Sequence, residues 1–445
     1  MGSKEFMKSS QLFSGSVLTL LTRIGTFVLN FLTLIFITRA LGPENVGLYA
    51  LLTLVPMTLA SFGVPNMSIA NVYYSGQDKY ELSKIAANSL LGVVFFSIVL
   101  WGLVGLISLL PVFNAVLISK GISSTQLWLV VIVLPFYILF KWYSGILRGV
   151  GKIGLFNIAS FVGVLVQFVL VEVFVLLGSI NLFFVLLSFV FSNVAAAIVV
   201  FVLVCRLTPI RLSLDWSLVK TMLGYGMKAY LWNTAEFFDN QSTIILIAVL
   251  VSTTELGYYS VAANVSGKLL FIAEAAATVL FPYVSTAIHQ EKTGNVTSAV
   301  CRYVFFLMSM AGLCIGVYAD PLVRLMFGTE FMPAVQPLQV LLVAVIIASF
   351  SRLITVDFAG RGNPEMGAFS SVISLIVSVV LIIGLTKSYG IVGVAFATLG
   401  GYVARTVVMV ILFSNKHHIP AWHMVVPRKT DWHNVKSMAS KLRLM

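Results

Sequence analysis

Apolar residues are grouped along this chain in runs of about 20 positions or more, separated by short polar segments. A helix of this length crosses the hydrocarbon core of a bilayer, which is about 30 Å thick. So many runs argue against a soluble helical protein with one large core. We therefore predict an all-α integral membrane protein with about twelve transmembrane helices. The predicted spans cover 14–38, 46–74, 85–109, 126–147, 154–177, 182–205, 225–250, 257–287, 298–319, 334–357, 366–387 and 390–414.

The composition agrees with a chain surrounded by lipid. Of the 445 residues, 59% are hydrophobic and only 10% are charged, and the mean hydropathy is +1.01. A soluble domain of this length needs more charge to cover its surface. The cysteines Cys205, Cys301 and Cys314 show no metal-ligand spacing. We therefore predict neither a metal site nor a resident cofactor.

Basic residues fall mainly on one side of the predicted membrane. With a cytoplasmic N-terminus, sixteen Lys and Arg residues lie in cytoplasmic segments, and the other side holds only Arg39, Lys120, Arg324 and Lys387. Because cytoplasmic loops carry the excess of positive charge, this arrangement predicts that both termini are cytoplasmic. The net charge of +12 then reflects topology and attraction to anionic lipid headgroups. It does not indicate a nucleic-acid partner.

The two halves of the chain resemble each other. Gly47–Ala50 begins the second span and Gly257–Ser260 begins the eighth, at an offset of 210 residues. Lys141–Lys152 closes the fourth span and Arg352–Asn363 closes the tenth, at an offset of 211 residues. Six spans per half make the repeats parallel, and we expect the substrate path between the two lobes. The predicted organisation is an expression remnant at 1–6, an N-terminal six-helix lobe at 7–205, a cytoplasmic linker with an amphipathic helix at 206–224, a C-terminal six-helix lobe at 225–414 and a cytoplasmic basic tail at 415–445.

Charged residues also occur inside the predicted spans or at their edges. On insertion scales, a charge that faces lipid at the centre of a helix costs about 2.5–3.5 kcal/mol. These residues must therefore face one another, a water-filled cavity or the membrane interface. Glu274 lies about 240° around its helix from Lys268, so we expect it to pair with a different residue. The set comprises Arg23, Lys141, Lys228, Lys268, Arg302, Arg352, Arg405, Glu172, Glu236, Asp239, Glu274 and Asp357.

The spacing of polar residues favours a cavity. They recur every three to four positions along the first, seventh and eighth predicted spans, which places them on one face of each helix. Arg352, Arg302 and Lys141 lie near cytoplasmic ends, where their side chains can instead extend to lipid headgroups. We predict a cationic, substrate-binding cavity between the lobes that is formed by Arg23, Lys228, Lys268, Asn30, Asn264 and Arg352.

The residue types in this cavity suit a phosphate-bearing substrate. A pyrophosphate that leaves water needs cationic donors, and arginine offers a planar fork while lysine offers a compact charge. Glu236 and Asp239 lie about one helical turn apart, so they can share a proton or bind Na⁺ through oxygen atoms. We predict these two acids as the ion-coupling residues. In the alternative interpretation they only neutralise Lys228.

Motifs for catalysis are missing from the sequence. It contains no Walker A, HExxH, kinase or GxSxG motif, and the segments outside the predicted spans are short. A lipid-modifying enzyme would need larger loops that carry acids and histidines, whereas most histidines here lie after residue 414. We therefore predict a transporter without catalytic residues.

Several loop motifs resemble those of one transporter family. The segments Arg39–Tyr49, Glu255–Ser260, Phe327–Ala334 and Gly360–Pro364 are similar to segments of prokaryotic polysaccharide exporters of the O-antigen flippase type. The resemblance covers essentially the whole chain after residue 6. The family belongs to the multidrug/oligosaccharidyl-lipid/polysaccharide superfamily, which also contains lipid II flippases and multidrug and toxic compound extrusion antiporters.

The resemblance implies two lobes around a V-shaped, alternating-access cavity in the cell (inner) membrane. It implies translocation of undecaprenyl-pyrophosphate-linked oligosaccharide to the outer leaflet, coupled to H⁺ or Na⁺ through the seventh span. Lipid II flippases have two further C-terminal spans, so an O-antigen-type repeat unit is favoured over lipid II. We expect a monomer that contacts membrane lipids and associates with polysaccharide polymerase machinery. The alternative is a cation-coupled multidrug exporter of the same superfamily, whose cavity would carry more acids than bases.

Overall fold

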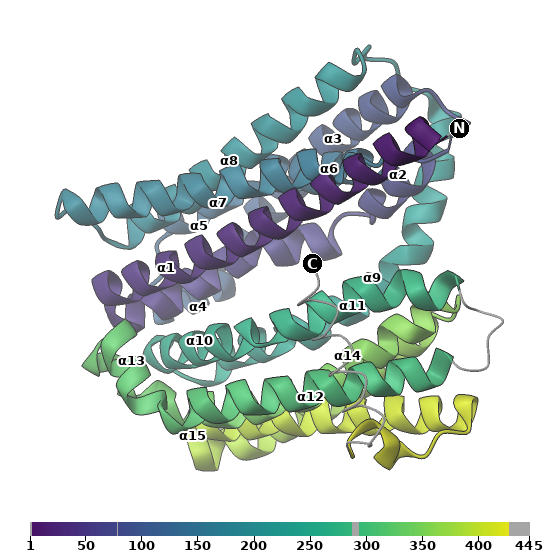
Figure 1. The fold of residues 1–445 in the computed structure, drawn as a ribbon. Helices are drawn as coiled ribbons and strands as arrows, with labels where there is room; N and C mark the ends of the chain where they lie inside the picture. Colours follow the sequence, from purple (N-terminus) through teal and green to yellow (C-terminus); the bar gives the residue numbers. More distant parts are fainter. Residues whose placement is uncertain (1, 78, 287–292, 427–445) are drawn as a thin grey trace. The chain divides into compact units, whose positions relative to one another are not determined.

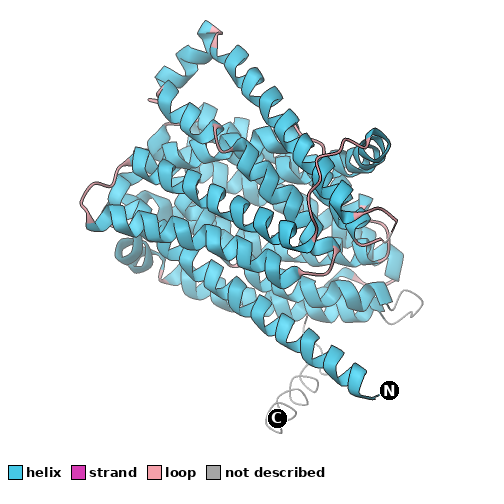
Figure 2. Ribbon diagram, turned by 90° about the horizontal axis from the view of Figure 1, so that it is seen from above, coloured by secondary structure: helices cyan, strands magenta, loops and turns pink. Residues whose placement is uncertain are grey.

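The computed structural model describes residues 2–77, 79–286 and 293–426, which form helices joined by short loops (Figure 1). Within these ranges every regular element is a helix and no strand is present (Figure 2). The side chains of residues 2–20 and of several positions in the ninth helix, including Lys228 and Glu236, lie outside the described set, as does the backbone of most of the predicted basic tail. The predicted all-α class is confirmed.

The helices follow the predicted spans closely. The first half contains α1 (Gly2–Phe62), α2 (Met67–Ser75), α3 (Leu82–Ser108), α4 (Pro111–Ser119), α5 (Ser124–Val131), α6 (Leu134–Gly149), α7 (Ile153–Leu176) and α8 (Leu182–Leu207). The second half contains α9 (Trp216–Leu250), α10 (Thr253–Lys268), α11 (Leu270–Thr286), α12 (Thr293–Val317), α13 (Ala319–Phe327), the 3₁₀ helix η1 (Thr329–Ala334), α14 (Val335–Gly360), α15 (Glu365–His417) and the 3₁₀ helix η2 (Ala421–Met424). Residues 216–224 of the predicted linker form the first turns of α9.

Nine helical stretches in the described part of the chain are long and apolar enough to cross a bilayer. Two of them hold two predicted spans each, because the chain turns at Gly42 (φ 72°, ψ 171°) within α1 and at Gly390 (φ 54°, ψ −138°) within α15. A positive φ costs glycine little, since it has no Cβ. With the span in α9 added, these stretches agree with the prediction of about twelve transmembrane helices, which is confirmed.

The chain divides into two compact units, each of which packs mainly against itself. Unit 1 comprises Met1–Thr234 and Ser252–Gly257, and unit 2 comprises Ala235–Val251 and Tyr258–Met445. The division falls within α9 and near the start of α10, whereas the predicted lobes meet at the preceding linker. The boundaries of the predicted lobes stay a prediction.

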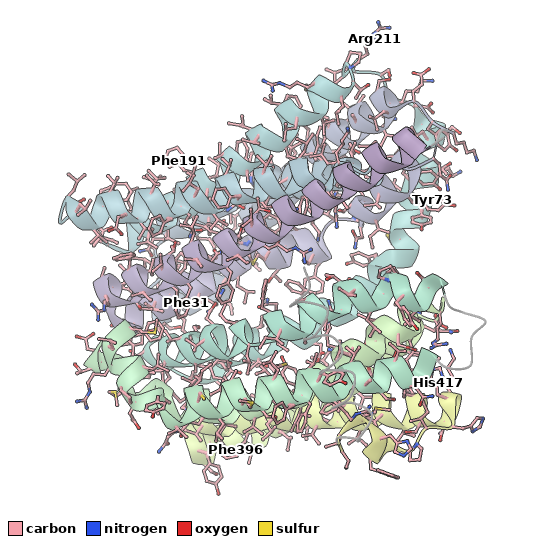
Figure 3. The ribbon with its side chains drawn as sticks, viewed as in Figure 1. Phe31, Tyr73, Phe191, Arg211, Phe396 and His417 are labelled. Carbon is pink, nitrogen blue, oxygen red and sulfur yellow. The ribbon has the colours of Figure 1, made fainter. Side chains whose placement is uncertain are left out.

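Each unit packs its helices around a buried core. In unit 1, α7 lies along both α1 and α8, and α6 packs against α2 and α8 (Figure 1). In unit 2, α14 is central and contacts α11, α12 and α15. Apolar side chains also cover outward faces: Phe191 on α8 and Phe396 on α15 are 50% and 48% exposed and point away from their bundles (Figure 3). Such faces suit contact with lipid tails.

The internal repeat is visible in the backbone where α6 and α14 end. Each helix is followed by a glycine of positive φ, Gly151 (φ 74°) and Gly362 (φ 80°), at an offset of 211 residues. In both turns the residue after the glycine donates its amide to the carbonyl five positions earlier, at 2.8 Å and 2.9 Å. The glycine itself donates to the carbonyl three positions earlier, at 3.1 Å and 3.0 Å. This is the same Schellman motif in each half.

A second repeated pair of glycines forms a close backbone crossing within unit 1. A Cβ atom on Gly47 would lie 1.9 Å from the carbonyl oxygen of Thr253, and one on Gly257 would lie 1.9 Å from that of Pro43. Each glycine therefore faces the residue four positions before the other glycine. The relation is reciprocal, and only glycine allows the two backbones to approach so closely.

Candidate functional site

Two basic side chains of unit 1 lie in membrane-spanning helices. Arg23 is on α1 and exposed, and Lys141 is on α6 and half-buried. Sixteen residues of helix, about 24 Å at 1.5 Å per residue, separate Arg23 from Arg39, so Arg23 lies within a span of about 30 Å. In the described part of the chain, no carboxylate pairs with Arg23 or Lys141. Among the described residues, unit 1 thus presents two cations to which no carboxylate is paired.

Polar contacts between α2 and α6 fix the backbone that carries Lys141. The Ser68 hydroxyl donates to the carbonyl of Lys141 at 2.9 Å, and the side-chain amide of Asn71 donates to the carbonyl of Trp142 at 2.9 Å. A Cβ on Gly145 would lie 2.5 Å from the carbonyl oxygen of Ser68, so the two helices meet at backbone distance. This part of α6 is held firmly, which fixes the direction in which Lys141 leaves the helix.

Unit 2 carries a different arrangement, in which arginines have acidic partners. Arg352 on α14 places Nε 2.6 Å from Oε1 of Glu274 on α11, and its Nη2 donates to Oε2 of the same carboxylate at 3.1 Å. The carboxylate thus faces the Nε–Nη2 edge of the guanidinium with both oxygens, through one hydrogen bond and one ionic contact. Glu274 therefore pairs with a residue other than Lys268, as its position on the helix predicted.

A second ion pair lies deeper in unit 2. Arg405 on α15 places Nη1 2.6 Å from Oδ2 of Asp239 on α9. The side chains are only 10% and 1% exposed. Asp239 was predicted as an ion-coupling residue, and the alternative interpretation paired it with Lys228. The structure gives it a fixed cation, Arg405, which spacing along the sequence did not identify.

The two arginines line one pocket in unit 2. The pocket holds about 600 Å³ of empty space, including open solvent. Its lining comprises Leu270, Glu274, Ala348, Ser351, Arg352, Tyr402 and Arg405.

The remaining predicted residues are only partly accounted for. Asn30 and Asn264 each donate their side-chain amide to the carbonyl four positions earlier, at 2.9 Å and 2.8 Å, and Lys268 is half-buried. The side chains of Lys228 and Glu236 lie outside the described residues. Arg23 and Asn30 belong to unit 1, whereas Asn264, Lys268 and Arg352 belong to unit 2. The predicted chamber shared between the lobes therefore stays a prediction.

Asp357, at the Gly360 end of α14, has a structural role that was not predicted. Its fully buried carboxylate accepts from Arg361 Nε at 2.6 Å and from the Thr297 hydroxyl at 2.5 Å. His417, labelled at the end of α15 in Figure 3, places Nε2 3.6 Å away. One carboxylate thus links α12 to α14 by hydrogen bonds and lies close to α15. The signal was available locally, because Asp357 and Arg361 are four residues apart on a helix.

Comparisons with known proteins agree with this architecture. The described fold is similar to that of a lipid II flippase MurJ in an inward closed conformation, with a TM-score of 0.75, 14% sequence identity, and coverage of 93% of this chain and 89% of that one. It is also similar to an inward-facing multidrug resistance MATE family transporter of the MOP superfamily, with a TM-score of 0.68, 16% identity, and coverage of 88% and 94%.

A curated relative points in the same direction. The probable low-salt glycan biosynthesis flippase Agl15 of Haloferax volcanii is 24% identical over 191 residues, which span 42% of this chain and only 40% of that protein. These three proteins are named as flippases or a transporter, not as enzymes. The family model described as "Polysaccharide biosynthesis protein" matches residues 36–336. The resemblance seen in the loop motifs is thereby confirmed, and the chain belongs to this family of polysaccharide biosynthesis proteins.

Proposed function

We propose that this protein moves an oligosaccharide linked to a polyprenyl diphosphate, of the O-antigen repeat type, from the inner to the outer leaflet of the cell membrane by alternating access. Membership of a polysaccharide biosynthesis family and a fold like that of a lipid II flippase support the substrate class. The lipid tail stays in the bilayer, and the protein's task is to shield the diphosphate and sugar from hydrocarbon.

The observation that carries the proposal is the pair of basic side chains in unit 1. Arg23 and Lys141 lie in membrane-spanning helices, and in the described part of the chain neither has an acidic partner. A charge in a low-dielectric region is costly unless water or an opposite charge accompanies it. A passing diphosphate supplies that opposite charge, because its oxygens accept the hydrogen bonds that Arg and Lys donate.

Coupling to H⁺ or Na⁺ is part of the proposal, with Glu236 and Asp239 as its candidate residues. A cation-coupled multidrug exporter is the second candidate, favoured by the likeness to the MATE transporter. In that function a buried carboxylate would bind the cation or the drug. Asp239 instead contacts Arg405 at 2.6 Å, so a coupling ion must displace an arginine there in either function, and a multidrug exporter would need the same carboxylate for its cationic drug as well. We therefore rank the multidrug exporter second.

Removing both cations of unit 1 tests the proposal. We expect Arg23→Ala combined with Lys141→Ala to reduce glycan export at least tenfold, because each lost charge-assisted bond to phosphate is worth about 1.5–3 kcal/mol. Surface glycan and membrane-bound lipid-linked oligosaccharide would be measured in a host whose own copy is deleted and replaced by the variant. The lipid-linked precursor should accumulate as surface glycan falls.

Two control variants make the result specific. Arg324→Ala removes one positive charge from an exposed position outside the predicted spans, and Arg23→Lys with Lys141→Arg keeps both charges. Both variants should export at close to the normal level, with equal amounts of protein in the membrane. Normal surface glycan in the double alanine variant would refute the proposal.

A further inference from the structure

The pocket of unit 2 holds an arginine fork that a carboxylate already occupies. Glu274 meets Nε and Nη2 of Arg352 through separate oxygens, at 2.6 Å and 3.1 Å. A phosphate group presents two oxygens to arginine in the same planar, bidentate manner as a carboxylate does. The side chain of Glu274 is therefore placed where a phosphate would bind to Arg352.

The two ion pairs of this pocket differ in how readily they exchange. The side chains of Arg352 and Glu274 are 34% and 45% exposed, whereas those of Arg405 and Asp239 are 10% and 1% exposed. A pair in contact with water contributes little net stability, so a competing anion replaces one partner at small cost. A buried pair is held much more firmly, because breaking it leaves an uncompensated charge. Arg352 can therefore release its carboxylate while Arg405 keeps its own.

We infer that Arg352 binds a phosphate group of the substrate in this pocket, and that Glu274 is an internal competitor that occupies the same fork when the phosphate is absent. The inference rests on the proposed function and adds a binding site and a competing residue to it. Displacement of Glu274 leaves the guanidinium groups of Arg352 and Arg405 on the pocket wall. Arg352, no longer neutralised by Glu274, then contributes positive potential to the bound phosphate, while Arg405 stays paired with Asp239.

A competing carboxylate changes how the site works during transport. Arginine forks bind phosphate tightly, and tight binding slows release on the far side of the membrane. When Glu274 returns to the fork it neutralises Arg352 again, so the phosphate leaves without exposing an unpaired guanidinium. Glu274 thus lowers affinity and speeds release.

Binding of a short polyprenyl diphosphate tests this inference. Radiolabelled farnesyl diphosphate and, separately, pyrophosphate would be bound to the purified full-length protein in detergent. We expect Glu274→Gln to bind farnesyl diphosphate about tenfold more tightly than the unaltered protein, because a neutral amide competes poorly with phosphate. Arg352→Gln should bind at least tenfold more weakly, and adding Glu274→Gln to it should restore nothing. A larger gain for farnesyl diphosphate than for pyrophosphate assigns the site to the lipid-linked form, and the reverse assigns it to free phosphate.

Glu330→Gln is the matched control, since it removes the same charge from an exposed position of unit 2 outside the pocket. Equal affinity gains in Glu330→Gln and Glu274→Gln would show a general charge effect and overturn the inference. Unchanged or weaker binding by Glu274→Gln, with normal binding by the unaltered protein, would overturn it while leaving the proposed function intact. If no variant bound either probe, the inference would fail. The proposed function is tested separately, because only normal export by the Arg23→Ala, Lys141→Ala double variant would refute it.

Discussion

Replacing Gly257 with alanine is expected to destabilise the folded protein by about 3 kcal/mol, at the upper end of the range for overpacking. The new Cβ would lie 1.9 Å from the carbonyl oxygen of Pro43 and 2.8 Å from its carbonyl carbon. Both are backbone atoms, so no side-chain rotation relieves the overlap, and the two helices must move apart. Gly47→Ala should have a similar effect, because its Cβ would lie 1.9 Å from the carbonyl oxygen of Thr253. Thermal unfolding of the detergent-solubilised protein, followed by size-exclusion chromatography, measures the loss.

Gly267→Ala is the control for this prediction. Gly267 is on the same helix, α10, and a Cβ there meets no atom within 4 Å. Because alanine is the better helix former by about 1 kcal/mol, this variant should be at least as stable as the unaltered protein. If Gly257→Ala unfolded at the same temperature as Gly267→Ala, the close crossing of the two backbones would be wrong.

The second large effect is expected at the buried ion pair. Asp239→Ala removes the carboxylate 2.6 Å from Arg405 and leaves a guanidinium whose side chain is only 10% exposed. Removing one partner of a buried pair costs about 3–5 kcal/mol, so a marked drop in the apparent melting temperature should follow. Arg405→Gln should cause a comparable drop. The combination of Asp239→Asn with Arg405→Gln should lose less than the two single variants together, since no unpaired charge remains.

The half-exposed pair provides the comparison. Glu274→Gln disturbs a pair whose side chains are 34% and 45% exposed, so its cost in stability should be about 1 kcal/mol or less. Additive losses at Asp239 and Arg405 would mean that the two residues are not energetically coupled. A loss at Glu274 as large as that at Asp239 would contradict the distinction between an exchangeable pair and a buried one.

Most of the fold could be predicted because the bilayer imposes one rule on every span. About 20 apolar residues are needed to cross it as a helix, and the runs along this sequence have that length. The repeat was also readable, since the glycine turns after α6 and α14 keep the same residue at an offset of 211. The predicted boundary between the lobes lay in the linker at 206–224, which overlaps the first turns of α9, and hydropathy does not detect that the packing of α9 changes along its length.

The site was less predictable because partners far apart in the sequence meet only in the folded chain. Glu274 and Arg352 are 78 positions apart, and Asp239 and Arg405 are 166 apart. Helical spacing identifies which residues share a face of one helix, but it does not say which face of another helix opposes it. The polar faces of single helices therefore showed which charges lie inside the spans. The partner of each charge can be identified only from the folded chain, in which α11 packs against α14 and α9 lies near α15.

The Schellman turns after α6 and α14 place Lys141 and Arg352 at the same distance, eight residues, from the ends of their helices. The neighbours of these two cations have diverged. At the repeat offsets of 211 and 210 residues, the position that corresponds to Glu274 is Gly63 or Val64. Unit 1 therefore has no carboxylate at the position that corresponds to Glu274, the partner of Arg352. The two halves share the scaffold but differ at one position of a neighbouring helix, so we expect Lys141 to meet an anion without the internal competitor that Arg352 has.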